Sequence, residues 1–223
     1  MFDMLCEALL VILYKIKFLE SKTMTKDNLL KLIAESGYNI GYGAKKHLAT
    51  YDMVEKIPGW IGFISLVVGV YALLIPDLTQ NTISAAFIVI GIASLFINFY
   101  ADAKDKYQVA GSALTDKFHE LRILYQTVKS TNTGDDLTQY TEDLKRIQKE
   151  VFSLRINKQI FLSDWYAHYK FFWQSQTGWM DEQLNFSLLR DKWPLSFTII
   201  VLLIAAGLIY KATLLLIHLI HFC

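Results

Sequence analysis

The sequence is poor in the residues that make turns and cross-links. Among 223 residues there are only 3 Pro, 11 Gly and 2 Cys. So few turn-forming residues argue against a β-rich fold and against long disordered linkers. Cys6 and Cys223 lie at opposite ends of the chain, so neither a disulfide framework nor a metal site can be inferred from them.

Charge is also scarce, and its two signs are balanced. Charged residues make up 19% of the chain, and 22 basic against 21 acidic residues leave a net charge of +1. Ordinary soluble domains contain about 25% charged residues. The balance excludes a generally basic nucleic-acid-binding protein, so we expect no direct binding to nucleic acid. With 53% hydrophobic residues, the composition indicates an all-α membrane protein.

The apolar residues are gathered into three runs. The runs at 57–76 and 78–101 contain no charged residue, and a third run at 193–223 contains only Lys211. About 20 apolar residues are enough to cross a bilayer as a helix. A buried core helix is the alternative, but such helices are usually shorter and polar on one side. We therefore predict a transmembrane helical hairpin and a C-terminal hydrophobic helix that spans the membrane or associates with it.

The positions of the basic residues predict an orientation. Lys residues precede the first run and follow the second, whereas the loop at 76–82 between them contains neither Lys nor Arg. Because basic residues are retained in the cytosol, we predict a multi-pass protein whose N-terminus is cytosolic and whose 76–82 loop is outside. The aromatic residues expected to anchor the helices at the cytosolic interface are Trp60, Tyr100 and Trp193.

This orientation divides the chain into four regions. Residues 1–56 are expected to form cytosolic or interfacial helices, 57–101 the transmembrane hairpin, 102–192 a cytosolic segment and 193–223 the C-terminal helix. A short apolar stretch at 9–14 lacks the basic start and cleavage site of a secretory signal, so we expect an interfacial helix there.

Beyond the second run, the apolar residues become periodic. Steps of four and three connect Tyr107, Gly111, Leu114, Phe118, Leu121, Tyr125 and Val128. This spacing predicts that the membrane helix continues without a break from Thr82 to Val128. After a turn at 130–135, a second stripe connects Leu137, Tyr140, Leu144, Ile147, Val151, Leu154, Lys158 and Phe161. The two stripes predict an antiparallel helical hairpin packed within one chain or between subunits, with Leu114, Leu121, Leu144 and Val151 as packing positions.

The segment at 161–193 is crowded with aromatic residues, including four of the five Trp. Three interpretations remain open. The segment could lie along the membrane interface, form a buried aromatic core under the hairpin, or stack a nucleotide base, although no phosphate-binding element accompanies it.

No motif for catalysis or for cofactor binding is present. The sequence has no CxxC, HExxH, P-loop or GxSxG pattern, and the pair His218 and His221 is a weak indication of metal binding. The Gly-rich basic stretch at 37–47 matches a phosphate-binding loop only weakly, because its surroundings are helical. We therefore expect no enzyme activity, no cofactor and no metal.

Small and polar residues within the two spans indicate sites of close approach. Ser65 and Gly69 are four residues apart in the first span, a spacing that lets membrane helices pack closely. In the second span, Asn98 is the most polar residue. Its side chain needs either an interhelical hydrogen bond or a position facing a pore.

Two segments carry a family resemblance: GYGAKKHLATYDMVEKIPGWIGF, which enters the first span, and FYADAKDKYQVAGSALTDKFHEL, which follows the second. Together with the layout of the spans, they make roughly residues 30–165 resemble the SLATT group of two-span effector domains of bacterial conflict systems. The resemblance implies a homo-oligomeric pore in the bacterial inner membrane that a cytosolic signal opens to arrest an infected cell. It also implies a sensor linked to a nucleotide signal or to a reverse transcriptase.

On this basis the first hypothesis is a pore-forming effector of antiphage defence. The second span would line the pore, through Ser84, Gly91, Ser94 and Asn98. The second hypothesis is a non-conducting membrane anchor that recruits a cytosolic partner through the helical hairpin. A membrane-embedded enzyme is the least favoured, because no acid–base constellation is visible.

Overall fold

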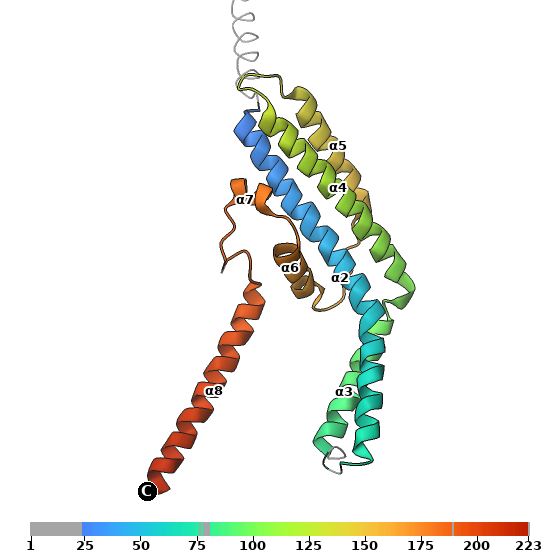
Figure 1. Cartoon of the computed structure of the whole chain (residues 1–223), viewed down its shortest axis with the longest axis vertical. Helices are drawn as coiled ribbons and strands as arrows, with labels where there is room; N and C mark the ends of the chain where they lie inside the picture. The colour runs from blue at the N-terminus through green and yellow to red at the C-terminus, as the bar shows by residue number, and fades with distance from the viewer. Residues whose placement is uncertain (1–23, 76, 78–80, 189, 223) are drawn as a thin grey trace, which may run out of the picture.

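The computed structural model describes residues 24–75, 77, 81–188 and 190–222, with backbone alone from residue 214. The described residues form helices and connecting segments without a strand, which confirms the all-α prediction (Figure 1). The predicted interfacial helix at 9–14, both Cys residues and the side chains of His218 and His221 lie outside this description.

The first predicted span is the second half of a much longer helix, α2 (Lys26–Ala72). Its first turn is capped by the Thr25 hydroxyl, which accepts a hydrogen bond from the Asn28 N–H at 3.3 Å. In its first half, apolar residues at helical spacing, such as Ile33, Ile40 and Ala44, are buried. From Trp60 onward the helix is largely exposed. One helix therefore belongs both to a packed core and to the apolar hairpin.

The predicted single helix from Thr82 to Val128 is wrong. The chain forms α3 (Asn81–Asn98), a short 3₁₀ turn η2 (Ala101–Ala103) and then α4 (Lys104–Ser130). At the break, the N–H of Tyr100 donates to the Ile97 carbonyl at 3.0 Å, which tightens the chain into a turn. Tyr100 is only 7% exposed, because the break turns its ring inward.

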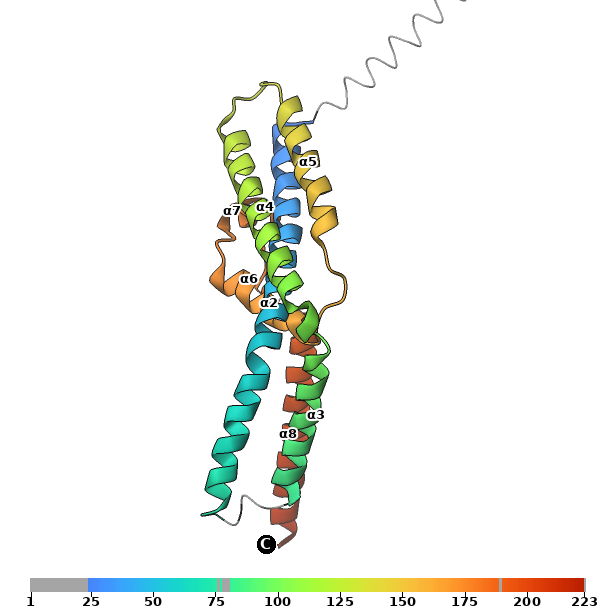
Figure 2. The same ribbon diagram turned by 90° about the vertical axis from the view of Figure 1, so that its right-hand side faces the viewer.

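The helical hairpin beyond the break is confirmed as a local structure. α4 is followed by a turn and by α5 (Thr138–Leu154), which packs against it (Figure 2). All seven residues of the first predicted stripe are buried, and so are Leu144, Ile147 and Val151 of the second. α5 ends at Leu154, so Lys158 and Phe161 of the second predicted stripe do not lie on it.

α4 of this helical hairpin packs along the first half of α2, and this contact is the most extensive between the helices that the structure describes. Two further helices, α6 (Ser163–Gln174) and α7 (Gly178–Leu184), cover another side of α2. We call α4 to α7 together with α2 up to Val54 the bundle. Residues of the predicted regions 1–56 and 102–192 thus share one core.

The aromatic segment contributes to that core. Phe171 of α6 and Trp179 of α7 are buried in the cluster that contains Leu29, Leu114 and Leu121. This supports the interpretation of a buried aromatic core for these two residues. Phe161, Tyr169 and Trp173 remain exposed.

The C-terminal helix α8 (Leu195–Phe222) leaves the bundle on the same side as the apolar hairpin formed by the second half of α2 and α3. α8 stands apart from that hairpin (Figure 1). Three helices of the described chain, within α2, in the α3–α4 segment and in α8, are long and apolar enough to cross a membrane. At most 6% of any of these apolar windows is buried within the chain.

Glycines on α2 offer a test of this packing. A Cβ added at Gly41 would lie 2.7 Å from Phe118 Cδ2 and 2.9 Å from Phe171 Cε2, whereas a Cβ at Gly43 would meet nothing within 4 Å. We expect Gly41→Ala to lower the free energy of unfolding by about 1–3 kcal/mol through overpacking. Gly43→Ala should raise it by about 0.5–1 kcal/mol through helix propensity. Chemical denaturation of the protein in detergent measures both changes, and equal effects would contradict the packing described.

Candidate functional site

The segment after α5 crosses the base of the bundle, where α2 and α3 leave it. We call residues 155–161 the strap. The Tyr107 hydroxyl donates a hydrogen bond to the Lys158 carbonyl at 2.5 Å, and the Tyr100 hydroxyl donates one to the Gln159 carbonyl at 3.3 Å. Lys158 also places its ammonium 4.9 Å from the centre of the Tyr100 ring. The strap is therefore bound to the chain on both sides of the α3–α4 break.

The other side of the strap is bound to α2. The N–H of Ile156 donates to His47 Nε2 at 3.0 Å, and the Thr50 hydroxyl donates to Gln159 Oε1 at 2.5 Å. Because His47 Nε2 accepts, its Nδ1 carries the proton and donates to the Gly43 carbonyl at 2.7 Å. The imidazole is thus neutral, and its burial lowers the pKa of His47.

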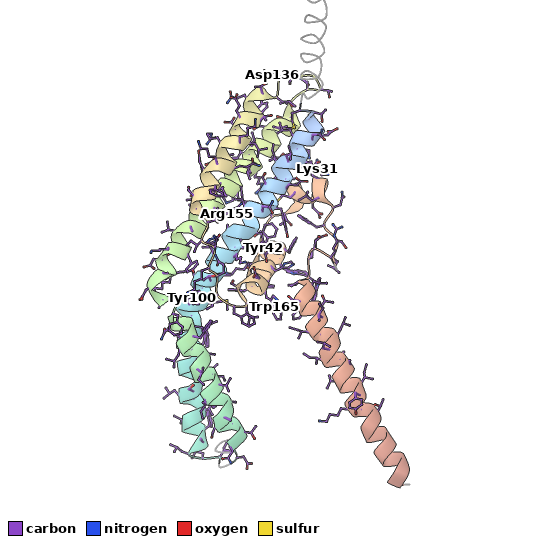
Figure 3. The ribbon with its side chains drawn as sticks, turned by 180° about the vertical axis from the view of Figure 1, so that it is seen from behind. Lys31, Tyr42, Tyr100, Asp136, Arg155 and Trp165 are labelled. Atoms are coloured by element: carbon purple, nitrogen blue, oxygen red, sulfur yellow. The ribbon has the colours of Figure 1, made fainter. Side chains whose placement is uncertain are left out.

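Beneath these hydrogen bonds lies a small apolar cluster, separate from the main core. Val54 of α2, Ile97 of α3, Tyr100, Tyr107 and Ile160 of the strap are all buried in it. Each of the two hairpin helices contributes a residue at the point where it enters the bundle. The strap thus packs against α2 and α3 where the transmembrane hairpin meets the bundle. Figure 3 shows Tyr100 at this level of the molecule.

Ion pairs surround this cluster. Lys104 Nζ lies 2.5 Å from the Glu55 carboxylate, which connects the start of α4 to α2. Asp52 of α2 pairs with Lys56 at 2.9 Å and with Lys170 of α6. Such pairs near the surface contribute little stability individually, and two of the three connect α2 to a neighbouring helix, α4 or α6.

The predicted interface anchors occupy three different environments. Trp60 is 62% exposed on α2, just beyond the last buried residue of the bundle. Trp193 is 40% exposed before α8, and its ring lies 5.4 Å from that of Phe197. Tyr100, in contrast, is buried under the strap and packs there.

Three of the four predicted pore-lining residues share one side of α3. Ser84, Gly91 and Asn98 are spaced by seven residues and are exposed in the single chain. Ser94 is half-buried and lies nearer the side of α3 that faces α2. The side chain of Asn98 makes no hydrogen bond to any residue that the structure describes. An interhelical hydrogen bond, the alternative interpretation, is thus not formed within this part of the chain.

The two small residues of the first span, Ser65 and Gly69, differ in exposure. Ser65 is half-buried and belongs to the row that contains Ile61 and Val68, both of which are also half-buried. Gly69 is exposed, and an added Cβ there would meet nothing within 4 Å. The four packing positions of the helical hairpin, Leu114, Leu121, Leu144 and Val151, are all buried in the core.

His47, Thr50 and Gln159 were not predicted as site residues. His47 and Thr50 lie on the buried side of α2, so their spacing with Ile40 and Ala44 carried a signal. Gln159 carried none, because it belongs to an irregular segment more than 100 residues away in the sequence.

No group of three or more potential metal ligands occurs within the described residues. The strap region is built from hydroxyl, amide and imidazole groups that satisfy one another. Through these contacts the strap holds the base of α2 beside the end of α3.

A comparison with protein families identifies a family that has this sequence pattern. The family model described as "SMODS and SLOG-associating 2TM effector domain 6" matches residues 24–201. The match begins next to α2 and ends inside α8, so it covers the bundle, the hairpin and the start of the third apolar helix. No curated protein and no solved structure matches the chain.

The neutral state of His47 predicts a dependence of stability on pH. Because its pKa is lowered in the folded protein, stability is fully present above the unfolded value of about 6.5 and declines as the pH falls below it. The His47→Gln variant should lose part of this decline and keep the part due to His168, whose pKa is also lowered by burial. Thermal unfolding between about pH 5 and 8 measures both slopes, and parallel slopes in the two proteins would contradict the assignment.

Proposed function

We propose that this chain, which belongs to the family of SMODS and SLOG-associating 2TM effector domains, is an oligomeric pore-forming effector of bacterial antiphage defence. The exposure of its three membrane-capable helices carries the proposal. At most 6% of each apolar window is buried within the chain. Surfaces so apolar require lipid or other protein around them.

The second support is a stripe of small and polar residues on α3, which consists of Ser84, Gly91 and Asn98. All three face away from the core of the chain. A polar side chain within a bilayer needs a partner or water, and three helices are too few to enclose water. Several copies of the chain placing this stripe inward satisfy that need, which makes the effector a homo-oligomer.

The third support is the connection between the bundle and the hairpin. α2 is one helix from the main core to the outer loop, and it passes Pro58 between Val54 and Trp60. Figure 1 shows that α2 changes direction below the bundle, and proline is an identified cause of such bends. A signal that moves the bundle against the strap would therefore change the angle of the first span.

The proposed topology follows from the basic residues at the bundle ends of the spans. The bundle lies in the cytosol, the hairpin and α8 cross the inner membrane, and the C-terminus lies outside. The protein acts without enzyme activity. Its partners are lipid, further copies of itself and a sensor linked to a nucleotide signal or to a reverse transcriptase.

The pore is tested in cells whose growth the protein arrests. We expect them to take up a membrane-impermeant dye and to lose their membrane potential. Gly91→Leu should block dye uptake, because its side chain would fill the pore. The matched variant Ala85→Leu, on another exposed side of α3, should not block it. Growth arrest in fully polarised cells would favour the non-conducting anchor instead.

Cysteine labelling tests which side of α3 faces water. In a background of Cys6→Ser and Cys223→Ser, we expect Ser84→Cys and Asn98→Cys to react with a water-soluble thiol reagent. Ile92→Cys, which is exposed on α3 but off the stripe, should react at least about tenfold more slowly, because a thiol in lipid stays protonated and dry. Equal rates at the three positions would exclude the stripe as the pore lining.

A further inference from the structure

A cleft that does not involve the strap opens between α2, α4 and the C-terminal end of α6. Its volume is about 310 Å³, which is the size of a small-ligand pocket. Its lining includes Gly41 and Lys45 of α2, His119 and Arg122 of α4, and Gln174 and Gln176 at the end of α6. Gly41 and Lys45 both come from the Gly-rich basic stretch at 37–47. In the helix they lie one turn apart on the same side of α2.

The charge of this cleft is not balanced. Its lining contains Lys45, Arg122 and His119 and no carboxylate. Neither Lys45 nor Arg122 forms an ion pair with a carboxylate of the described residues. The larger cleft beside the start of α8 differs, since its Lys46 pairs with Asp164 at 2.7 Å and its Arg190 with Asp191 at 3.1 Å.

The surroundings of Lys45 disfavour its positive charge. Burial and the nearby ammonium of Lys170 both lower the pKa of Lys45. Lys170 is itself paired with Asp52, so that carboxylate is already engaged. A protonated Lys45 therefore lacks a counter-charge within the described chain, and a bound anion would supply it.

Hydrogen-bond donors complete the cleft. The side-chain amides of Gln174 and Gln176 make no hydrogen bond to the rest of the described chain, and they lie beside the basic groups. The guanidinium of Arg122 can donate two parallel hydrogen bonds to one oxyanion, and Lys45 adds a point charge. These lining groups can all act as donors, which suits a tetrahedral oxyanion with many acceptor oxygens.

We infer that this cleft binds a compact phosphate-bearing anion, held by Lys45 and Arg122 and by the amides at the end of α6. Its volume favours a small phosphate or phosphate ester over a polymer. The site bridges α2, α4 and α6, and Lys45 lies two residues before His47, which binds the strap. Binding at the site does not depend on pore formation, so it can be tested separately.

The test uses the full chain in phosphatidylcholine nanodiscs, titrated calorimetrically with inorganic pyrophosphate at constant ionic strength. We expect binding to the natural protein, and affinities about tenfold lower for Lys45→Gln and for Arg122→Gln, as for the loss of one charged hydrogen bond. Lys46→Gln is the matched control, because its ammonium lines the other cleft, and it should bind as the natural protein does. Absent binding, or equal affinities in all four proteins, would overturn the inference.

Two additional measurements separate folding effects and sources of the phosphate. Without anion, Lys45→Gln should unfold at or above the temperature of the natural protein, because it removes repulsion from Lys170. A loss of binding in a protein that is this stable cannot be attributed to misfolding. In nanodiscs that contain phosphatidic acid, an apparent affinity for pyrophosphate weaker than in nanodiscs of equal charge made with phosphatidylglycerol would indicate a lipid phosphate as the ligand. Equal affinities in the two would indicate a soluble phosphate.

Discussion

Close packing between the first half of α2 and α4 holds the other elements in place. It depends on glycine: a Cβ at Gly111 would lie 2.7 Å from Leu48 Cγ, so the two helix backbones approach more closely than larger residues allow. Along this contact the apolar residues of both helices form one core, which α5 closes on one side and α6 and α7 on another. The strap then crosses the lower end of the same helix pair, where its hydrogen bonds have a rigid surface to bind.

The apolar helices outside the bundle are, in contrast, largely exposed. They bury almost nothing against one another, and their side chains are apolar on nearly every side. In lipid this is stable, because a helix satisfies its own backbone hydrogen bonds and its apolar surface needs no partner. The base of the bundle is the place where one environment replaces the other, and the polar groups of the strap are concentrated there. Under the proposed function, a movement of the bundle would reach both spans at this boundary.

Much of this arrangement can be predicted from local patterns. The steps of four and three in α4 and α5 identify buried sides correctly, and uninterrupted apolar runs identify the membrane-capable helices. The break at Tyr100 leaves no proline or glycine as a local signal, because the residues from Ile97 to Lys104 contain neither. It arises from contacts with Lys158 and Gln159, which are distant in sequence. Gln159 itself could not be predicted for the same reason. The predicted regions 1–56 and 57–101 also divide α2, because the core half and the apolar half of this helix differ in composition.

The order of the elements along the chain has a consequence for biogenesis. The core of the bundle is discontinuous, because α2 is separated from α4 by the whole apolar hairpin. When the ribosome has synthesised α2, the partners of Leu29, Ile33 and Ile40 do not yet exist. The hairpin is made next, so its insertion brings α4 back beside α2 and shortens the search between them. Correct insertion of the two spans is thus a step in folding the water-exposed half, and a chain that fails to insert leaves the buried face of α2 without its partner.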